Sequence, residues 1–394
     1  MSIRTRKRGK SYSYVFEAGK SADGKRKVIE KGGFKSAEEA YDAGVSAYVD
    51  WKHGNIGIVS EQITFADMLN LWLEKNSPNV KENTRILYQK ISECKIIPYL
   101  GDVVVQQLTP IILDDWLQAR VNEGLSQAYL KQLMSVVKLT LKYAVYPCNI
   151  IASSPAEYIK IPRCCPKNII KRKVITPETF SELLRDHPIG NAYRIPLLIS
   201  YYTGMRMGEV LGLTWDNIDM IHNVIKATQQ LQYIDGKGFA LTGLKSQSSY
   251  REIPVSTKLV EALQDWKMLQ DINSGLRGSS YIISYYKDDS KFIWSASKEI
   301  AGNVNGIDFV CTDEKGKYLS RFSYMSHLRK FGLNSHSFRH SHATLLIEAG
   351  ASPKGVATRL GHADVLLTQN LYTHETEELR QDTLSCFDKR LKNR

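Results

Sequence analysis

The chain has 394 residues, of which 43% are hydrophobic and 24% are charged, and its formal net charge of +12 gives a pI near 9.2. This length predicts two or three domains with a sizeable buried core. No apolar run approaches the roughly 18 residues of a membrane span, so we expect no membrane partner. The basic N-terminus is not followed by the apolar segment of a secretory signal, and we therefore expect a cytoplasmic location.

The six cysteines show no C-x-x-C pair, and two adjacent cysteines cannot form a relaxed disulfide with each other. We therefore expect reduced thiols at all six positions: Cys94, Cys148, Cys164, Cys165, Cys311 and Cys386.

The positive charge is concentrated at the N-terminus. Residues 1–35 hold eleven Lys and Arg against three acidic residues, an excess of +8. That footprint indicates a nucleic acid or an anionic lipid as partner. Short strands are predicted in SYSYVFEAG and KRKVIEKGGF, followed by a helix from Ser36. Tyr12, Tyr14 and Phe16 alternate as on one strand face, and packing on that helix is favoured over stacking in a groove.

Residues 64–152 show apolar residues at three- and four-residue spacing, which predicts a bundle of four or five helices. Thr109-Pro110 and Ser126 are predicted helix starts. The segment SPAEYIKIPRCCPKNIIKRKVITPE contains four prolines and a basic excess, as in an exposed interdomain linker.

A larger domain follows Thr176. It begins with helices and passes through strands in NVIKATQQLQYI, GFALTGLKS and YREIPVS, with DGKG as the first turn. Helices are then predicted to the end. The predicted fold class is multidomain: a three-stranded β-sheet with a helix, an all-α helical bundle, and a mainly α domain with a small antiparallel sheet (α+β).

His336, Arg339 and His340 lie three and four residues apart, so they share one face of a helix. An arginine fork with histidines beside it can grip a phosphate, although a helix N-terminus with exposed polar residues is an equally ordinary explanation. The i, i+4 histidines also match zinc-protease helices. Such sites need a glutamate after the first histidine, where this chain has Ser337, so no metal site is expected.

Further polar residues have ordinary explanations when taken singly. Arg206 follows a Thr-Gly break at a helix start, with Glu209 one turn along to hold its guanidinium. Lys245 lies at a hairpin edge, His362 sits between a glycine and a small residue, and Tyr372 follows ten residues later.

Together, in this order, Arg, Lys, His-x-x-Arg, His and Tyr resemble the tyrosine recombinases, or phage-type integrases. TGMRMGEVLGLTW resembles the family's first-arginine motif, GLKSQSSYREIPV its hairpin-lysine motif, and the segment from His336 to His374 its second box. The resemblance covers the chain from about Thr64. The first 55 residues resemble the small arm-type DNA-binding domain of integrases from conjugative transposons and temperate phages.

The resemblance implies a site-specific recombinase that integrates and excises a mobile element or prophage. Tyr372 would form a 3′-phosphotyrosyl bond, which stores the energy of the broken phosphodiester, so neither ATP nor another high-energy cofactor is implied. The two arginines would replace the metal that many phosphoryl-transfer enzymes require, so no metal is implied either. The resemblance implies that guanidiniums bind the phosphate, that His336 is the base and that Lys245 is the acid. The implied catalytic set is Arg206, Lys245, His336, Arg339, His362 and Tyr372.

The resemblance also implies the domains and partners. The expected domains are an arm-type DNA-binding domain (1–57), a helical core-binding domain of the SAM-like kind (62–155), a linker (156–173), and the catalytic domain with its tail (174–394). Expected partners are double-stranded DNA at core and arm sites, other protomers in a tetramer, an excisionase and a DNA-bending host factor. Two alternatives stay open: a non-catalytic DNA-binding protein on the same fold, and a type IB-like topoisomerase.

Overall fold

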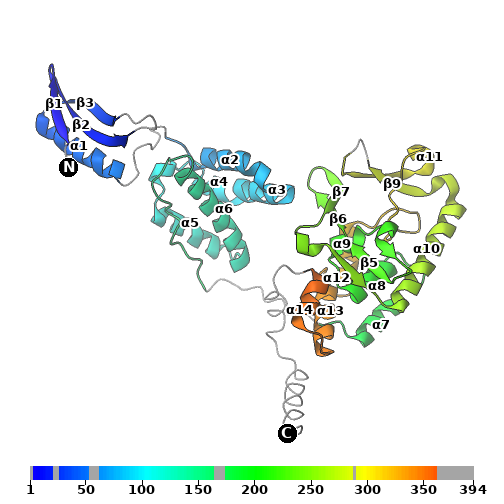
Figure 1. Cartoon of the computed structure of the whole chain (residues 1–394). Helices are drawn as coiled ribbons and strands as arrows, with labels where there is room; N and C mark the ends of the chain where they lie inside the picture. The colour runs from blue at the N-terminus through cyan, green and yellow to red at the C-terminus, as the bar shows by residue number, and fades with distance from the viewer. Residues whose placement is uncertain (1–2, 21–25, 53–61, 164–173, 287–289, 362–394) are drawn as a thin grey trace, which may run out of the picture. The chain divides into compact units, whose positions relative to one another are not determined.

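The computed structural model describes residues 3–20, 26–52, 62–163, 174–286 and 290–361 (Figure 1). The chain divides into two compact units, Met1–Ile169 and Ile170–Arg394. The predicted combination of a small N-terminal sheet, a helical bundle and a mixed α and β catalytic part is confirmed.

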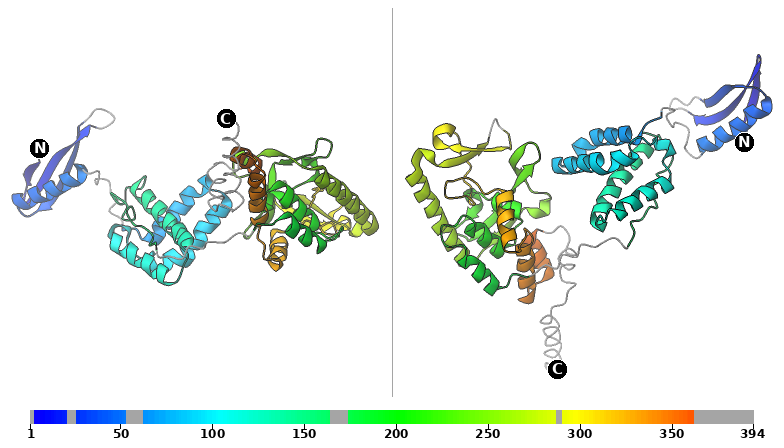
Figure 2. Two further views of the ribbon diagram at one scale, coloured as in Figure 1. Left: turned by 90° about the horizontal axis from the view of Figure 1, so that it is seen from below. Right: turned by 180° about the vertical axis from the view of Figure 1, so that it is seen from behind.

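The N-terminal part is a three-stranded antiparallel sheet with one helix packed on it, made of β1 (Arg4–Arg8), β2 (Ser11–Lys20), β3 (Arg26–Phe34) and α1 (Ala37–Lys52). The views in Figures 1 and 2 show α1 running along one face of the sheet. Tyr14 and Phe16 are buried there, and the Phe16 ring meets the Tyr48 ring edge-on with centroids 5.4 Å apart. The packing interpretation of these aromatics is therefore confirmed. All five residues of β1 are exposed, four of them cationic.

The helical bundle follows. Its elements are α2 (Phe65–Asn76), a 3₁₀ turn (Ser77–Asn79), α3 (Glu82–Ile91), a π-helical turn (Ser92–Ile96), α4 (Ile97–Leu100), a 3₁₀ turn (Val105–Gln107), α5 (Pro110–Asn122) and α6 (Gln127–Val145). The predicted starts at Thr109 and Ser126 are confirmed, because each hydroxyl accepts a hydrogen bond from a first-turn amide. Among the described residues no helix combines the length and apolar character that crossing a bilayer needs.

The described residues of the second unit form three small antiparallel sheets, in the orders β4-β5-β8, β6-β7 and β10-β9. Its helices are α7 (Pro177–Arg185), α8 (Arg194–Thr203), α9 (Met207–Leu211), α10 (Thr257–Arg277), α11 (Lys298–Ala301), α12 (Arg321–Lys330), α13 (Ser337–Glu348) and α14 (Pro353–Leu360). Its 3₁₀ turns are Trp215–Asn217, Gln247–Ser249 and Gly278–Ser280. Its strands are β4 (Ile218–Asp219), β5 (Val224–Ala227), β6 (Gln229–Ile234), β7 (Gly238–Gly243), β8 (Arg251–Pro254), β9 (Ile282–Tyr286) and β10 (Ile293–Ser297).

The strand region differs from the prediction in two respects. The predicted strand over 223–234 is broken at Thr228 into β5 and β6, which belong to different sheets. The prediction of helices alone after residue 256 is wrong, because β9 and β10 form a hairpin between α10 and α12. Both strands have five residues, and periodicity cannot separate such short apolar runs from helix.

The core of this unit surrounds α8. Ile195, Leu197 and Ile199 on that helix are buried, and Phe338 of α13 is buried in the same cluster. Figures 1 and 2 show α13 and α14 side by side, with Ala343, Val356 and Leu360 buried between them. This packing brings the C-terminal ends of α8 and α14 to the start of α9.

Candidate functional site

Arg206 stands at the junction of α8 and α9. Helix α8 ends at Gly204, whose left-handed backbone (φ 63°) reverses the chain, and Arg206 is the N-cap residue of α9. Its amide and its Nη1 donate to the two oxygens of Glu209 at 3.0 and 2.8 Å. The predicted role of Glu209 as the holder of this guanidinium therefore agrees with the geometry.

Arg339 approaches the same junction from α13. The residue is only 6% exposed, and its Nη1 donates to Gly204 O at 3.0 Å and its Nη2 to Leu360 O at 2.7 Å. Burial, with the nearby charge of Arg206, lowers the pKa of Arg339 to about 9, so it is still cationic at neutral pH. The two predicted phosphate-binding arginines thus lie within electrostatic reach of each other.

The C-terminal end of α14 collects three guanidiniums on three consecutive carbonyls. Arg251 Nε donates to Arg359 O at 2.7 Å, Arg339 Nη2 to Leu360 O, and Arg206 Nη2 to Gly361 O at 3.1 Å. In the described chain these carbonyls have no partner further along the helix, and they lie at the negative end of its dipole, so cations are favoured here. The described chain ends at Gly361, one residue before His362.

Glu209 is the one carboxylate among the described residues that bonds to these cations. It is 1% exposed and also accepts from Arg251 Nη2 at 2.9 Å. Burial alone would raise the pKa of Glu209, but the charge and hydrogen bond of Arg251, with the hydrogen bonds from Arg206, outweigh it and lower the pKa below its ordinary value. Glu209 is therefore ionised and holds both arginines.

An arginine–histidine contact also holds α14 against its neighbours. Arg359 donates from Nε to His342 Nε2 at 3.0 Å, from Nη1 to Pro254 O, and from Nη2 to Tyr202 O. His342 Nδ1 lies 2.9 Å from Tyr201 O, so the ring is neutral with its proton on Nδ1. Burial, with the charge of Arg359, lowers the pKa of His342 to about 4.

The other predicted site residues are placed as follows. His336 is the exposed N-cap residue of α13, and Lys245 is exposed two residues after β7. His362 and Tyr372 lie outside the described residues. Within the described ranges, no group of three or more His, Cys, Asp or Glu side chains is arranged to hold a metal ion.

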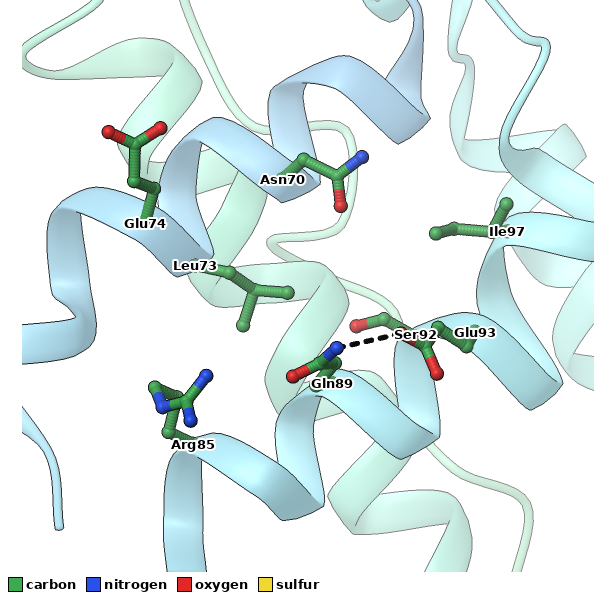
Figure 3. Close-up of a pocket in the computed structure, with 8 residues that line it drawn as sticks. All are labelled: Asn70, Leu73, Glu74, Arg85, Gln89, Ser92, Glu93 and Ile97. Carbon is green, nitrogen blue, oxygen red and sulfur yellow. Dashed lines mark hydrogen bonds between the residues drawn. The ribbon is translucent and has the colours of Figure 1, made fainter. Parts of the chain in front are cut away.

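A pocket at the surface of the helical bundle differs in chemistry from the arginine site. It lies between α2 and the run from α3 to α4, has a volume of about 340 Å³, and is drawn in Figure 3. Glu74 and Glu93 line it, and Gln89 Nε2 donates to Glu93 Oε1 at 2.9 Å. Two carboxylates against the single cation of Arg85 make this pocket unsuited to a phosphate, and none of the predicted catalytic residues lines it.

Three residues of the arginine network were not predicted as site residues: Arg251, Arg359 and His342. Each lies inside or beside a quoted motif. Their partners, however, are mostly backbone carbonyls far along the chain, which leave no trace in residue spacing.

Comparisons with known proteins cover most of the chain. The model described as "Phage integrase family" matches residues 174–378, "Phage integrase, N-terminal SAM-like domain" matches 64–119, and "Arm DNA-binding domain" matches 2–43. The ICEBs1 integrase of Bacillus subtilis (strain 168) is 26% identical over 325 residues, which is 80% of each chain.

Two solved structures share the fold. The Tn1549 transposon integrase in complex with a circular intermediate DNA superimposes with a TM-score of 0.64 at 19% identity, over 82% of this chain and 99% of that one. A lambda integrase tetramer bound to a Holliday junction gives a TM-score of 0.53 at 15% identity, over 93% and 95%.

The close packing at Gly204 yields a first prediction. A Cβ added there would lie 2.6 Å from Leu360 Cδ2 and 2.8 Å from His342 Cδ2, in a backbone conformation that disfavours side chains. Gly204→Ala should lower the free energy of unfolding by about 3 kcal/mol, from strain plus overpacking. Gly236→Ala is the matched control, since Gly236 has a similar φ of 74° and open space around it, and should cost only about 1 kcal/mol. Urea unfolding of the full chain measures both, and equal losses would contradict the packing argument.

The buried neutral His342 yields a second prediction. Its folded pKa of about 4 lies below the ordinary value near 6.5, so its contribution to stability is present above pH 6.5 and is lost as the pH falls toward 4. The loss should approach about 3 kcal/mol for this group. His342→Gln keeps a donor and an acceptor but does not titrate, so its unfolding free energy should fall less between about pH 7 and about pH 5. Identical pH slopes for the two proteins would contradict the assignment.

Proposed function

Because this chain belongs to the phage integrase family, and is thus a tyrosine site-specific recombinase, we propose that it cleaves and rejoins DNA through a 3′-phosphotyrosyl bond to Tyr372, integrating and excising a mobile element or prophage. The observation that carries the proposal is the convergence of Arg206 and Arg339 on consecutive carbonyls at the end of α14. That convergence supports a single phosphate held by both guanidiniums. The final carbonyl lies one residue before His362 in the chain.

The proposed chemistry is an in-line exchange of esters at phosphorus. The Tyr372 oxygen attacks the scissile phosphate, its proton passes to His336, and the 5′-oxygen leaves with a proton from Lys245. Arg206 and Arg339 offset the charge that develops on the non-bridging oxygens, which His362 also contacts by a hydrogen bond. Positive charge is thereby supplied by side chains, and the phosphotyrosyl ester retains the bond energy, so the reaction is proposed to need neither metal nor ATP.

The proposed partners follow from the family and from the charge distribution. We assign residues 1–57 to arm sites, 62–155 and 174–394 to the core site, and 156–173 to the linker between them; the matched ranges support this division. The DNA and the tetramer named for the solved relatives support double-stranded DNA and a homotetramer here. An excisionase, a DNA-bending host factor and a cytoplasmic location complete the proposal.

The covalent intermediate is directly testable. A nicked suicide duplex carrying the core site from the DNA that flanks the gene should give a 3′-linked adduct with the wild type and none with Tyr372→Phe. Arg339→Lys keeps the charge but loses the planar fork, so adduct formation should slow by roughly 100-fold or more. Tyr41→Phe is the matched control, because Tyr41 is half exposed on α1 and should leave the rate unchanged.

The same assay separates the alternatives. Retained binding without an adduct would favour a non-catalytic DNA-binding protein. Relaxation of supercoiled plasmids that lack paired sites would favour a topoisomerase.

The arm-domain assignment predicts the salt dependence of binding. Each phosphate contact contributes about 0.9 to the slope of log affinity against log salt, so removing residues 1–55 should flatten the slope on arm-site DNA. Replacing Arg4, Arg6 and Lys7 of the exposed strand β1 by Gln in the full chain should reduce the slope by up to about 3. Filter-binding titrations over a salt series measure both proteins. Unchanged slopes would count against the assignment.

A further inference from the structure

Arg251 is an extensively bonded arginine next to the candidate site. Its side chain is 6% exposed, and each of its three side-chain nitrogens donates: Nε to Arg359 O at 2.7 Å, Nη1 to Ser249 O at 2.8 Å, and Nη2 to Glu209 Oε2 at 2.9 Å. Nη1 and Nη2 each keep one further N–H group, but the side chain is almost fully buried and its described contacts are all with protein groups. Its role is therefore directed inward, toward protein groups.

The three acceptors belong to three different elements. Glu209 is on α9 and holds Arg206, Ser249 ends the 3₁₀ turn that begins two residues after Lys245, and Arg359 is in the last turn of α14. Arg251 also lies beneath Gly361, where an added Cβ would be 3.2 Å from Arg251 Cδ and Nη1. One planar guanidinium thus fixes the mutual position of three segments that lead to predicted catalytic residues.

Resting on the proposed function, we propose that Arg251 is a positioning residue for DNA cleavage, which acts through Glu209 and the C-terminal end of α14 to hold Arg206 where it can bind the scissile phosphate. The Arg206 side chain is more exposed than that of Arg251, at 34%, and its shortest hydrogen bond in the described chain runs from Nη1 to Glu209 Oε1 at 2.8 Å. Displacing that carboxylate displaces the Arg206 fork with it.

Electrostatics make Glu209 dependent on Arg251. The charged groups that face this buried carboxylate are Arg206 at the start of α9, Arg251 on β8 and Arg339 on α13. Arg251 provides the largest effect that opposes burial and keeps the pKa of Glu209 low. Without Arg251, the pKa of Glu209 must rise, and the protonated acid no longer holds Arg206 by charge.

The first test is the single-turnover rate of adduct formation on the nicked core-site duplex, with enzyme in excess. Arg251→Met removes all three hydrogen bonds, and Arg251→Lys keeps the charge but cannot reach three acceptors in one plane. Both variants should cleave roughly 100-fold more slowly than wild type, with DNA affinity little changed, because misplaced groups impair the chemical step.

The second test is the pH dependence, which a purely structural role would not alter. The ratio of wild-type to Arg251→Met rates should grow as the pH falls, by up to about tenfold per pH unit once Glu209 protonates in the variant. In a Glu209→Gln background the same ratio should be independent of pH, because no carboxylate remains to titrate. Arg251→Lys still presents a cation to Glu209, so the ratio of wild-type to Arg251→Lys cleavage rates should not change with pH.

Arg194→Met is the matched control for lost backbone contacts. Arg194 is half-buried in the same unit and donates to the carbonyls of Leu184 and His187, away from Glu209. This variant should unfold at a lower urea concentration but cleave at the wild-type rate. If Arg251→Met does not fold, the rate of Arg251→Lys decides.

These measurements distinguish failure of the proposed role of Arg251 from failure of the proposed function. Wild-type cleavage rates in the Arg251 variants would overturn the inference, and so would a slowing that only parallels a loss of DNA affinity. The inference would also be overturned if the effect of Arg251→Met on the cleavage rate still depended on pH in the Glu209→Gln background. In each of these cases the wild-type adduct still forms and the proposed function stands. Absence of that adduct would reject the proposed function and this inference with it.

Discussion

The arrangement of the catalytic unit depends on the last turn of α14, where three consecutive carbonyls receive three arginines. A helix end needs partners for its final carbonyls, and a buried helix end needs them from the protein. Here Arg251, Arg339 and Arg206 supply those donors in the order of residues 359, 360 and 361. The requirement of one short helix for capping thereby determines where the two predicted phosphate-binding groups stand.

Gathering several guanidiniums in one place is unfavourable unless their repulsion is offset. Arg206, Arg251 and Arg339 lie close enough to lower the pKa of Arg339, and the single buried carboxylate of Glu209 cannot neutralise all of them. The helix dipole and the carbonyls supply part of the balance. A net positive field remains, which is what an incoming phosphate requires. A neutral His342 suits the same surroundings, because a further cation beside Arg359 would add to the repulsion.

Local features of this site could be predicted from the sequence, and long-range ones could not. Arg206 and Glu209 are three residues apart, so their contact follows from helix geometry and from the Thr-Gly break before them. Arg251 and Arg359 are 108 positions apart and meet through a main-chain carbonyl. Every residue has such a carbonyl, so no side-chain pattern marks the pair. The break at Thr228 is equally hidden, because β5 and β6 differ in their sheet partners and not in composition.

The use of arginine throughout this network has a geometric reason. Arg339 joins the junction after α8 to α14, and Arg359 joins α13, β8 and α8, so each guanidinium spans two or three elements at once. A lysine ammonium carries the same charge on a single nitrogen and cannot donate in several fixed directions from one plane. Because the guanidinium donates in several fixed directions, it sets the orientation of the helices that it contacts. A position that needed only a cation would tolerate lysine. The positions of Arg339 and Arg359 need the shape of the guanidinium, because the packing of the elements that they join depends on its fixed geometry.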